Sequence, residues 1–404
     1  MKPFKITISV ILCFALVCSG VVASAATVSS ECDISDIEIP IDATVTDAVI
    51  GTTLDIKAKS AILIEINTGK ILYEMNADEQ IPPASITKIM SLLLVMEAID
   101  RGDMSLEDVI SASEHACSMG GSQIWLEPGE TMSVDDLLKA AVIASANDAT
   151  VALGEQIAGS EEGFVSMMNA RAAELGMTNT HFVNATGLDA EGHLSTAHDV
   201  AIMSAELIKH SLIKNYSTVW MDTLRNGESE LVNTNKLVRF YEGTTGLKTG
   251  TTSGAGYCLS ATAERNGLEL AAVIMSGDTS ADRFNGAKKL LDYGFANYAY
   301  TDITPELDDN ILLAVKGGTE PTVRLEARDN FGILLKKSDV ASITQKVNLT
   351  ENVTAPIKEG DVLGTVDFYS GENQIGSVDI TAAQNIDKMT FFTAFLWILN
   401  GLFQ

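Results

Sequence analysis

The sequence predicts an α+β fold, and three observations support this prediction. A β-rich run over residues 60–67 returns over 71–75 after a Thr-Gly turn, which is the pattern of a hairpin. Helical patterns then continue as far as Ile213, and three short strand patterns follow Thr244. Strand patterns therefore lie at both ends of this region. Its sheet must be assembled from both ends, with the helices between them.

The beginning of the chain has the pattern of an export signal. Residues 1–25 contain Lys2 and Lys5, then an apolar run, then the small residues Ala23-Ser24-Ala25, which is typical of a cleaved signal peptide. A membrane span is the alternative, but the apolar run is short and ends in the cleavage pattern. Residues 26–55 show no sustained period, so they are interpreted as a linker. The 404 residues exceed what one core usually fills, and we expect a large domain over 56–299.

Helix signals follow the hairpin in order. An almost wholly apolar run begins at Ser85 and predicts a buried helix that ends near Gly102. Ser133 has the position of an N-cap for a helix over 134–143. Apolar spacing predicts the further helices 148–158, 161–175, 196–213 and 281–298, and β patterns predict strands at 246–252, 256–263 and 268–275.

The last hundred residues have a different character. After residue 300 the helix signals give way to alternating runs at 311–315, 322–327 and 376–380, so we expect a small all-β domain over 300–385. Residues 389–404 are rich in Phe and Leu but shorter than the ~20 residues that span a bilayer. We interpret 386–404 as an amphipathic helix that anchors the chain in the plane of a membrane. Docking of this segment on its own domain is the alternative.

Composition excludes several classes of function. The chain has 54 acidic and 27 basic residues and a net charge of -27, which argues against a nucleic-acid partner. Removal of the signal leaves three of the five cysteines, Cys32, Cys117 and Cys258, without paired spacing. This argues against a disulfide framework and a zinc site, and we expect neither a metal nor a cofactor.

Three short motifs, in one order, carry the chemistry: Ser85-Ile-Thr-Lys88, Ser145-Ala-Asn147 and Lys248-Thr249-Gly250. This ordered set is typical of active-site serine enzymes. A second Ser-x-x-Lys, at Ser211, has no such companions. Taken singly, the motifs have structural explanations, because Ser85 and Asn147 could be helix caps and Lys248 a solvated strand residue. The complete ordered set favours catalysis.

No Ser-His-Asp arrangement is evident among the five histidines, so a lysine must activate the serine. Lys88 follows Ser85 by three positions, which places both side chains on one helix face. An ordinary lysine would be protonated, so we expect apolar neighbours and repulsion from Lys248 to lower the pKa of Lys88. The start of the helix, together with the N–H of Thr251, would stabilise an oxyanion.

The other motif residues have expected roles in substrate binding. Lys248 and Thr249 can hold a carboxylate, and Gly250 would allow the substrate backbone to lie against the strand. Ser145 would pass a proton to the leaving amine, and Asn147 would orient the substrate amide.

The chain resembles the serine-type D-alanyl-D-alanine carboxypeptidases, which are low-molecular-mass penicillin-binding proteins. The shared features are residues 83–88, 145–149, 184–188 (Asn-Ala-Thr-Gly-Leu), 233–237, 246–250 and 289–295, followed by a β domain and a C-terminal anchor. The resemblance implies a β-lactamase/transpeptidase-like catalytic domain, in which an antiparallel sheet is flanked by helices and accompanied by a helical subdomain. It also implies that Ser85 is acylated by a peptidoglycan stem peptide with release of terminal D-alanine, and that penicillin traps the same serine. Arg283 lies where the family places a carboxylate-binding arginine. The implied location is the outer face of the bacterial cytoplasmic membrane.

Three alternatives remain open on the sequence. A β-lactamase needs an additional carboxylate in a Glu-x-x-Leu-Asn setting, and the nearest match, residues 230–233, is one residue too short. A DD-endopeptidase that cleaves peptide cross-links would use the same motifs. A non-catalytic cell-wall scaffold would have no physical need for Lys88.

Overall fold

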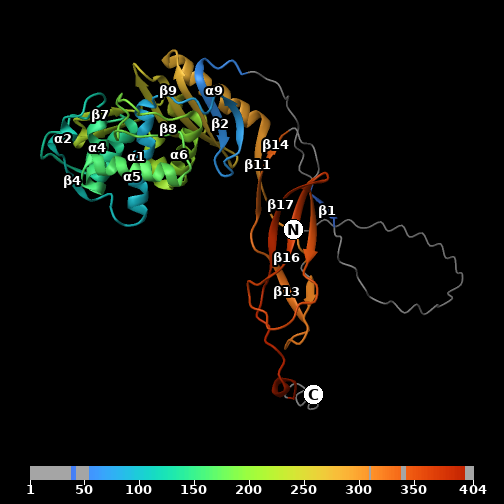
Figure 1. Ribbon diagram of the computed structural model, residues 1–404. Helices are drawn as coiled ribbons and strands as arrows, with labels where there is room; N and C mark the ends of the chain where they lie inside the picture. Colours follow the sequence, from blue (N-terminus) through green and yellow to red (C-terminus); the bar gives the residue numbers. More distant parts are fainter. Residues whose placement is uncertain (1–37, 42–53, 309–310, 338–342, 396–404) are drawn as a thin grey trace, which may run out of the picture.

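The computed structural model describes residues 38–41, 54–308, 311–337 and 343–395. The N-terminal domain is built on a five-stranded antiparallel sheet, as predicted from the strand patterns at both ends of this region (Figure 1). Its strand order is β3-β2-β10-β9-β8. The strands are β2 (Ala58–Glu65), β3 (Ile71–Met75), β8 (Thr244–Thr252), β9 (Gly256–Arg265) and β10 (Leu268–Gly277). Strand β8 lies at one edge of the sheet, so it pairs with a neighbouring strand, β9, on one side only.

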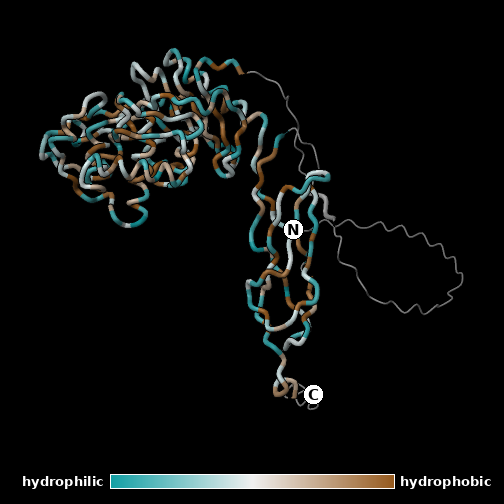
Figure 2. The backbone as a smooth tube through the Cα atoms, viewed as in Figure 1, coloured by the Kyte–Doolittle hydropathy of each residue, from teal (hydrophilic) through white to brown (hydrophobic). Residues whose placement is uncertain are grey.

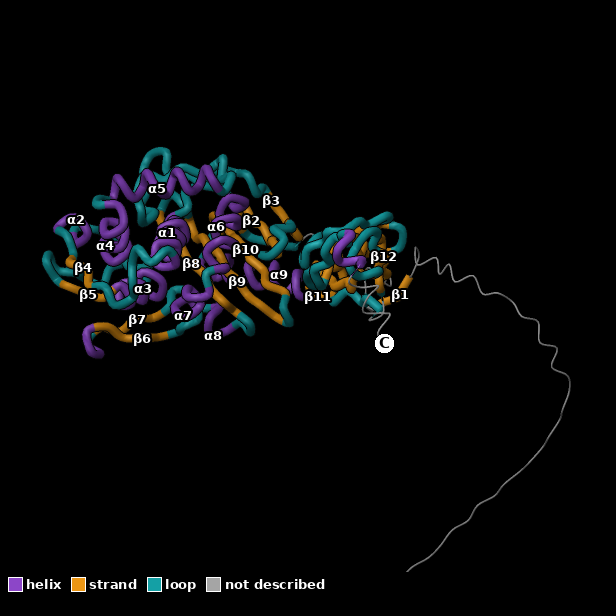
Figure 3. Tube along the Cα trace, turned by 90° about the horizontal axis from the view of Figure 1, so that it is seen from below, coloured by secondary structure: helices purple, strands orange, loops and turns teal. Residues whose placement is uncertain are grey.

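Both faces of this sheet are covered by helices. Helix α9 (Ser280–Asn297) packs on one face, and α1 (Lys88–Asp100) and α6 (Ala197–Lys209) lie on the other (Figure 3). The strands are apolar on both sides for this reason. On β2, Ala61 and Leu63 join the core beneath α9, whereas Ile62 and Ile64 join the larger core around α1.

The remaining helices pack around α1 and against the edge strand β8. They are α2 (Glu114–Cys117), α3 (Val134–Ile143), α4 (Asn147–Ala158), α5 (Glu161–Glu174), α7 (Lys214–Ser217) and α8 (Leu237–Phe240), with short 3-10 turns at Ala84–Thr87, Ser211–Ile213 and Arg225–Gly227. Two ribbons accompany them, β4 (Val109–Ser111) with β5 (Thr131–Ser133), and β6 (Met221–Leu224) with β7 (Ser229–Val232). Ser133 caps α3 as predicted, since its hydroxyl accepts the N–H of Asp136.

Two predicted helices differ in detail from the structure. The helix predicted from Ser85 begins with a 3-10 turn, and regular α-helix starts only at Lys88. The turn begins at Ala84, whose φ of 49° is in the left-handed region. The helix predicted over 196–213 ends at Lys209, because His210 has an extended backbone and a separate 3-10 turn follows it.

The C-terminal region is a β domain. Its six-stranded sheet has the order β1-β15-β16-β17-β13-β12, with β1 (Glu38–Ile41), β12 (Leu312–Ala314), β13 (Thr322–Ala327), β15 (Ile343–Leu349), β16 (Val362–Ser370) and β17 (Asn373–Ala382). Alternating burial along β15 and β16 encloses a core that contains Val366 and Phe368. In Figure 2, hydrophobic (brown) and hydrophilic (teal) stretches are interspersed along the strands of this domain. A further two-stranded ribbon pairs β11 (Tyr298–Ile303) with β14 (Phe331–Lys336). This ribbon joins the two domains, because Tyr298 and Leu334 pack in the core beneath α9.

Part of the predicted linker is structured. Residues 38–41 of the segment 26–55 form β1, which pairs antiparallel with β15 at the edge of the β-domain sheet. The sequence signal was weak because an edge strand of four residues is too short to establish a period.

The predicted signal peptide lies outside the described residues, as does 396–404 of the predicted anchor. Within the anchor, residues 391–395 are helical, and Phe391, Phe392 and Phe395 are exposed. No helix among the described residues is both long and apolar enough to cross a membrane.

Candidate active site

Ser85 and Lys88 face each other at the start of α1. Lys88 Nζ lies 3.1 Å from Ser85 Oγ and 2.8 Å from the carbonyl oxygen of Thr186. The Lys88 side chain is completely buried. The amine is therefore held within hydrogen-bond distance of the hydroxyl, as expected from the spacing of three residues.

The surroundings of Lys88 disfavour its protonated form. Burial is the largest cause and lowers the pKa of Lys88 well below its ordinary value of 10.5, and the charge of Lys248 lowers it further. The carboxylate of Asp148 acts in the opposite direction but is the weaker influence. Both causes expected from the sequence are present, and a neutral amine can accept the serine proton.

The segment 145–147 joins α3 to α4, which packs against α1. Ser145 has φ of 63°, and its buried hydroxyl has no hydrogen-bond partner among the described residues. Asn147 is the first residue of α4; its Nδ2 donates to Gly120 O at 2.6 Å, whereas its Oδ1 has no partner in the same part of the chain. Ser145 Oγ and Asn147 Oδ1 are thus available for hydrogen bonds with a ligand.

Asp148 fixes the position of the segment 145–147 through hydrogen bonds to backbone N–H groups. Its buried carboxylate accepts the backbone N–H groups of Ile124 and Leu126, each at 3.1 Å, and that of Ala149 at 2.9 Å. These bonds connect the start of α4 to the neighbouring loop. The backbone of Asn147 also bonds this loop, because its N–H donates to Ser122 O at 2.7 Å.

Strand β8 runs directly beside the serine. A Cβ at Gly250 would lie 3.0 Å from Ser85 N and 2.9 Å from Pro83 O. From the sequence, we expect Gly250 to let the substrate backbone lie against the strand. In the structure, the absent side chain also makes room for the enzyme's own serine turn.

Lys248 is the second buried lysine of the site. Its Nζ donates to Thr249 O at 3.2 Å, and no carboxylate of the described residues forms an ion pair with it. Burial lowers the pKa of Lys248 to about 7, and the charge of Arg283 contributes. Thr249 Oγ1 donates to the hydroxyl of Thr234 at 2.7 Å. An anion that bound here would pair with a cation that lacks a partner.

Arg283 lies in the first turn of α9 and reaches the end of β8. Its Nη1 donates to Gly250 O at 2.9 Å and to Thr251 Oγ1 at 2.8 Å, while its buried Nε has no partner in the described chain. Burial also lowers the pKa of Arg283. The structure thus brings Arg283 next to Thr251, although one nitrogen of its guanidinium already binds the strand.

The residue types of the loop 184–188 predict no role for it, yet this loop contacts Lys88 and the backbone of Ala84. Thr186 supplies the carbonyl that accepts from Lys88. Gly187 has φ of 85° and approaches Ala84 O so closely that a Cβ could not fit. The loop appeared among the family motifs, but its contribution comes from backbone atoms, which residue types do not reveal.

His193 supports the 3-10 turn that contains Ser85. Its Nδ1 accepts the N–H of Val183, which leaves Nε2–H to donate to Thr87 Oγ1 at 2.8 Å. Burial lowers the pKa of His193 to about 4, so the ring is neutral near pH 7.

In the described part of the chain, no three His, Cys, Asp or Glu side chains gather to hold a metal ion.

Comparison with known proteins identifies this constellation. Residues 45–279 match the family described as D-alanyl-D-alanine carboxypeptidase, and 308–388 match the C-terminal domain of penicillin-binding protein 5. The chain belongs to the D-alanyl-D-alanine carboxypeptidase family. The resemblance inferred from the motifs and the predicted fold class are therefore confirmed, and the chain is a member of a serine hydrolase family.

Relatives in this family match over most of their length. The D-alanyl-D-alanine carboxypeptidase DacF of Bacillus subtilis is 42% identical over 83% of this chain and 88% of its own, and DacC of Escherichia coli is 35% identical over 83% and 86%. The crystal structure of penicillin-binding protein 5 from Haemophilus influenzae aligns with a TM-score of 0.71 at 30% identity, covering 83% of this chain and 99% of that chain. Penicillin-binding protein D2 of Listeria monocytogenes, solved in its ampicillin-bound form, aligns with a TM-score of 0.56 at 34% identity over 60% of this chain and 100% of its own.

Proposed function

We propose that this protein removes the terminal D-alanine from peptidoglycan stem pentapeptides through an acyl-enzyme on Ser85, and that penicillin acylates the same serine. The observation that carries the proposal is the 3.1 Å contact between Ser85 Oγ and the completely buried Nζ of Lys88. A buried lysine of lowered pKa beside a serine is the arrangement that nucleophilic catalysis without histidine requires. Relatives named D-alanyl-D-alanine carboxypeptidases support the substrate class.

In the acylation step, Ser85 Oγ attacks the carbonyl carbon of the penultimate D-alanine while Lys88 Nζ takes the serine proton. The backbone N–H groups of Ser85 and Thr251 stabilise the oxyanion of the tetrahedral intermediate. The proton returns through Ser145 to the amide nitrogen, so the C–N bond breaks and free D-alanine leaves. Water then attacks the ester carbonyl carbon while Lys88 Nζ takes a proton from it. This proton passes to Ser85 Oγ as the ester C–O bond breaks, and the shortened peptide is released.

The edge position of β8 supports the proposed binding mode. An extended stem peptide can align along this sheet edge with main-chain hydrogen bonds. The terminal carboxylate would be held by Lys248 and Thr249, with Arg283 acting beside Thr251, and Asn147 Oδ1 would orient the substrate amide. Without substrate, the Lys248 cation has no carboxylate partner among the described residues, which suits it to that anion.

The proposed location is the outer face of the bacterial cytoplasmic membrane. Residues 1–25 would direct export, and residues 386–404 would lie in the membrane plane behind a catalytic domain over 56–299 and a β domain over 300–385. The exposed side chains of Phe391, Phe392 and Phe395 support this anchor, because they place apolar rings in solvent at the end of the β domain.

The test combines two assays on the mature chain. Intact mass after mixing with penicillin should show a lasting adduct, and a D-Ala-D-Ala peptide should lose one D-alanine; both should vanish in Ser85→Ala while the fold is kept. Loss of penicillin without a lasting adduct would indicate a β-lactamase. An unmodified protein with the drug untouched would contradict the proposal and favour a scaffold. Cross-linked dimeric peptides, supplied in parallel, distinguish carboxypeptidase from endopeptidase activity.

A further inference from the structure

Lys88 has a second hydrogen-bond partner besides Ser85, the carbonyl oxygen of Thr186, and residues outside the active site fix the position of this carbonyl. Thr186 O, at 2.8 Å from Lys88 Nζ, belongs to the loop between α5 and α6. Asn184 shapes this loop, since its Oδ1 accepts the N–H groups of Thr186 at 3.2 Å and Gly187 at 2.7 Å. These bonds lie within the loop. They do not determine how the loop as a whole is placed against α1.

Ala185 attaches the loop to its neighbours through both of its backbone polar groups. Its carbonyl accepts the hydroxyl of Ser91 at 2.7 Å, three residues after Lys88 on α1. Its N–H donates to Oε1 of Glu161 at 3.0 Å. The peptide between Ala185 and Thr186 is therefore anchored to α1, and the preceding peptide is anchored to the first residue of α5.

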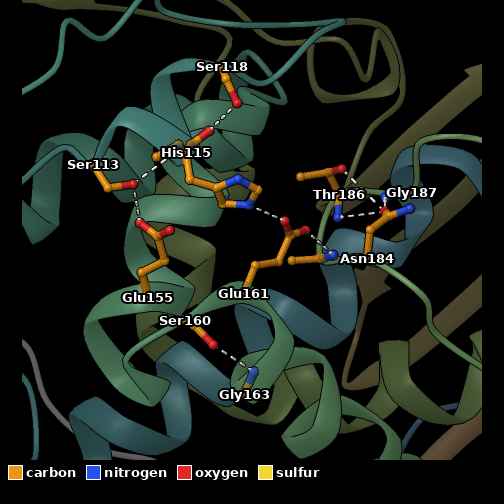
Figure 4. A network of polar contacts seen from close by, with 12 residues as sticks. Ser113, His115, Ser118, Glu155, Ser160, Glu161, Gly163, Asn184, Thr186 and Gly187 are labelled. Carbon is orange, nitrogen blue, oxygen red and sulfur yellow. Dashed lines mark hydrogen bonds and ion pairs between the residues drawn. The ribbon is translucent and has the colours of Figure 1, made fainter.

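Glu161 has a second partner, shown with it in Figure 4. Nε2 of His115, on α2, lies 2.6 Å from Glu161 Oε2, so the carboxylate bridges a histidine and the loop. The Glu161 side chain is only 13% exposed, whereas His115 is 46% exposed. The hydrogen bond that His115 donates to Glu161 is the main cause that raises the pKa of His115, and the charges of Glu155 on α4 and Glu162 on α5 raise it further.

We propose that Glu161, supported by His115, is a positioning residue for the base Lys88, because its carboxylate places Ala185 and so directs the Thr186 carbonyl at Lys88 Nζ. The inference rests on the proposed role of Lys88. A neutral amine has two N–H groups and one lone pair. When Thr186 O accepts one N–H, the lone pair can turn toward the hydroxyl of Ser85, which then donates to it. If the loop shifts, the amine loses this orientation, although Ser85 and Lys88 are unchanged.

The experiment measures penicillin acylation under single-turnover conditions, separating the dissociation constant of the non-covalent complex from the limiting acylation rate. In Glu161→Ala, we expect the limiting rate to fall about tenfold with the dissociation constant unchanged, since orientation and not binding is lost. Glu161→Gln keeps an oxygen that accepts from Ala185 and should restore the rate to within about threefold of wild type. His115→Ala should give an intermediate rate.

Glu162→Ala is the matched control. It removes the same charge from the same first helical turn, but Glu162 does not bond the loop. A wild-type rate in Glu161→Ala, or an equal loss in Glu162→Ala, would overturn the proposal. Equal losses in Glu161→Gln and Glu161→Ala would also overturn it, because charge and not the hydrogen bond would then be responsible. A wild-type rate in His115→Ala would remove the role given to His115. Absence of any acylation in the wild-type protein would instead refute the proposed function.

Discussion

Replacing Lys248 by methionine should make the protein more stable while removing the cation that is proposed to bind the substrate carboxylate. Lys248 is buried and has no carboxylate partner among the described residues. The fall in its pKa from 10.5 to about 7 means that its protonated form costs about 5 kcal/mol more in the folded than in the unfolded chain. Methionine cannot donate to Thr249 O, which forfeits about 1 kcal/mol. The expected net gain near pH 6 is about 3 to 4 kcal/mol.

The stability difference between Lys248→Met and wild type should depend on pH in one direction. Between pH 7 and pH 10.5 the unfolded wild-type chain binds more protons at Lys248 than the folded chain does, so wild-type stability rises with pH. The advantage of Lys248→Met is therefore complete below about pH 7 and should shrink steadily toward pH 10. Urea unfolding of both proteins across this range measures the difference in the free energy of unfolding.

Lys236→Met is the control, because Lys236 is an exposed lysine in the segment that precedes β8. The free energy of unfolding of Lys236→Met should show no gain over wild type that depends on pH. A difference between Lys248→Met and wild type that stays constant from about pH 6 to pH 10 would refute the reasoning, since the lysine would then titrate alike in both states. Peptidase activity should fall in Lys248→Met through a higher KM.

Three further predictions concern the same site. Gly250→Ala should displace the Ser85 turn, lowering the penicillin acylation rate at least tenfold and stability by about 1 to 3 kcal/mol; an unchanged rate would show that the turn tolerates a Cβ. Asp148→Ala should destabilise the protein by about 2 to 4 kcal/mol in urea unfolding, because it leaves buried N–H groups unpaired; Asp135→Ala, which removes a half-exposed carboxylate, should cost less. The value of kcat/KM for D-alanine release should fall in acid as Lys88 becomes protonated and should fall above about pH 7 as Lys248 loses its proton. A profile without an alkaline limb would contradict the role of the Lys248 cation.

Local chemistry was sufficient to predict most of the elements that carry the candidate site. The apolar run after Ser85 predicted a buried helix, and the strand patterns after Thr244 predicted the sheet edge that lies beside it. The expected fall in the pKa of Lys88 followed from its neighbours in sequence and from one long-range assumption, that Lys248 lies opposite. That assumption came from the order of the motifs and not from any periodicity.

What the sequence could not reveal are contacts made by backbone atoms. The carbonyl of Thr186 and the left-handed turn at Gly187 depend on how a loop folds over the Ser85 turn, and neither has a characteristic residue pattern. The motif pointed to Gly250, but the close approach of this residue to Ser85 N could not be predicted, because it is a tertiary contact. The same limit applies to β1, whose partner strand lies far away in the sequence.

The pairing of β1 with β15 has a topological consequence. Glu38–Ile41 precedes the peptidase domain and Ile343–Leu349 follows it, yet both belong to one sheet. The entire peptidase domain is therefore an insertion within the β domain, connected to it by two covalent segments. One proteolytic cut between β1 and β2 would leave the two domains covalently joined through β11. The β-domain sheet also cannot be completed until its first strand, synthesised earliest, meets a partner made after the whole insertion.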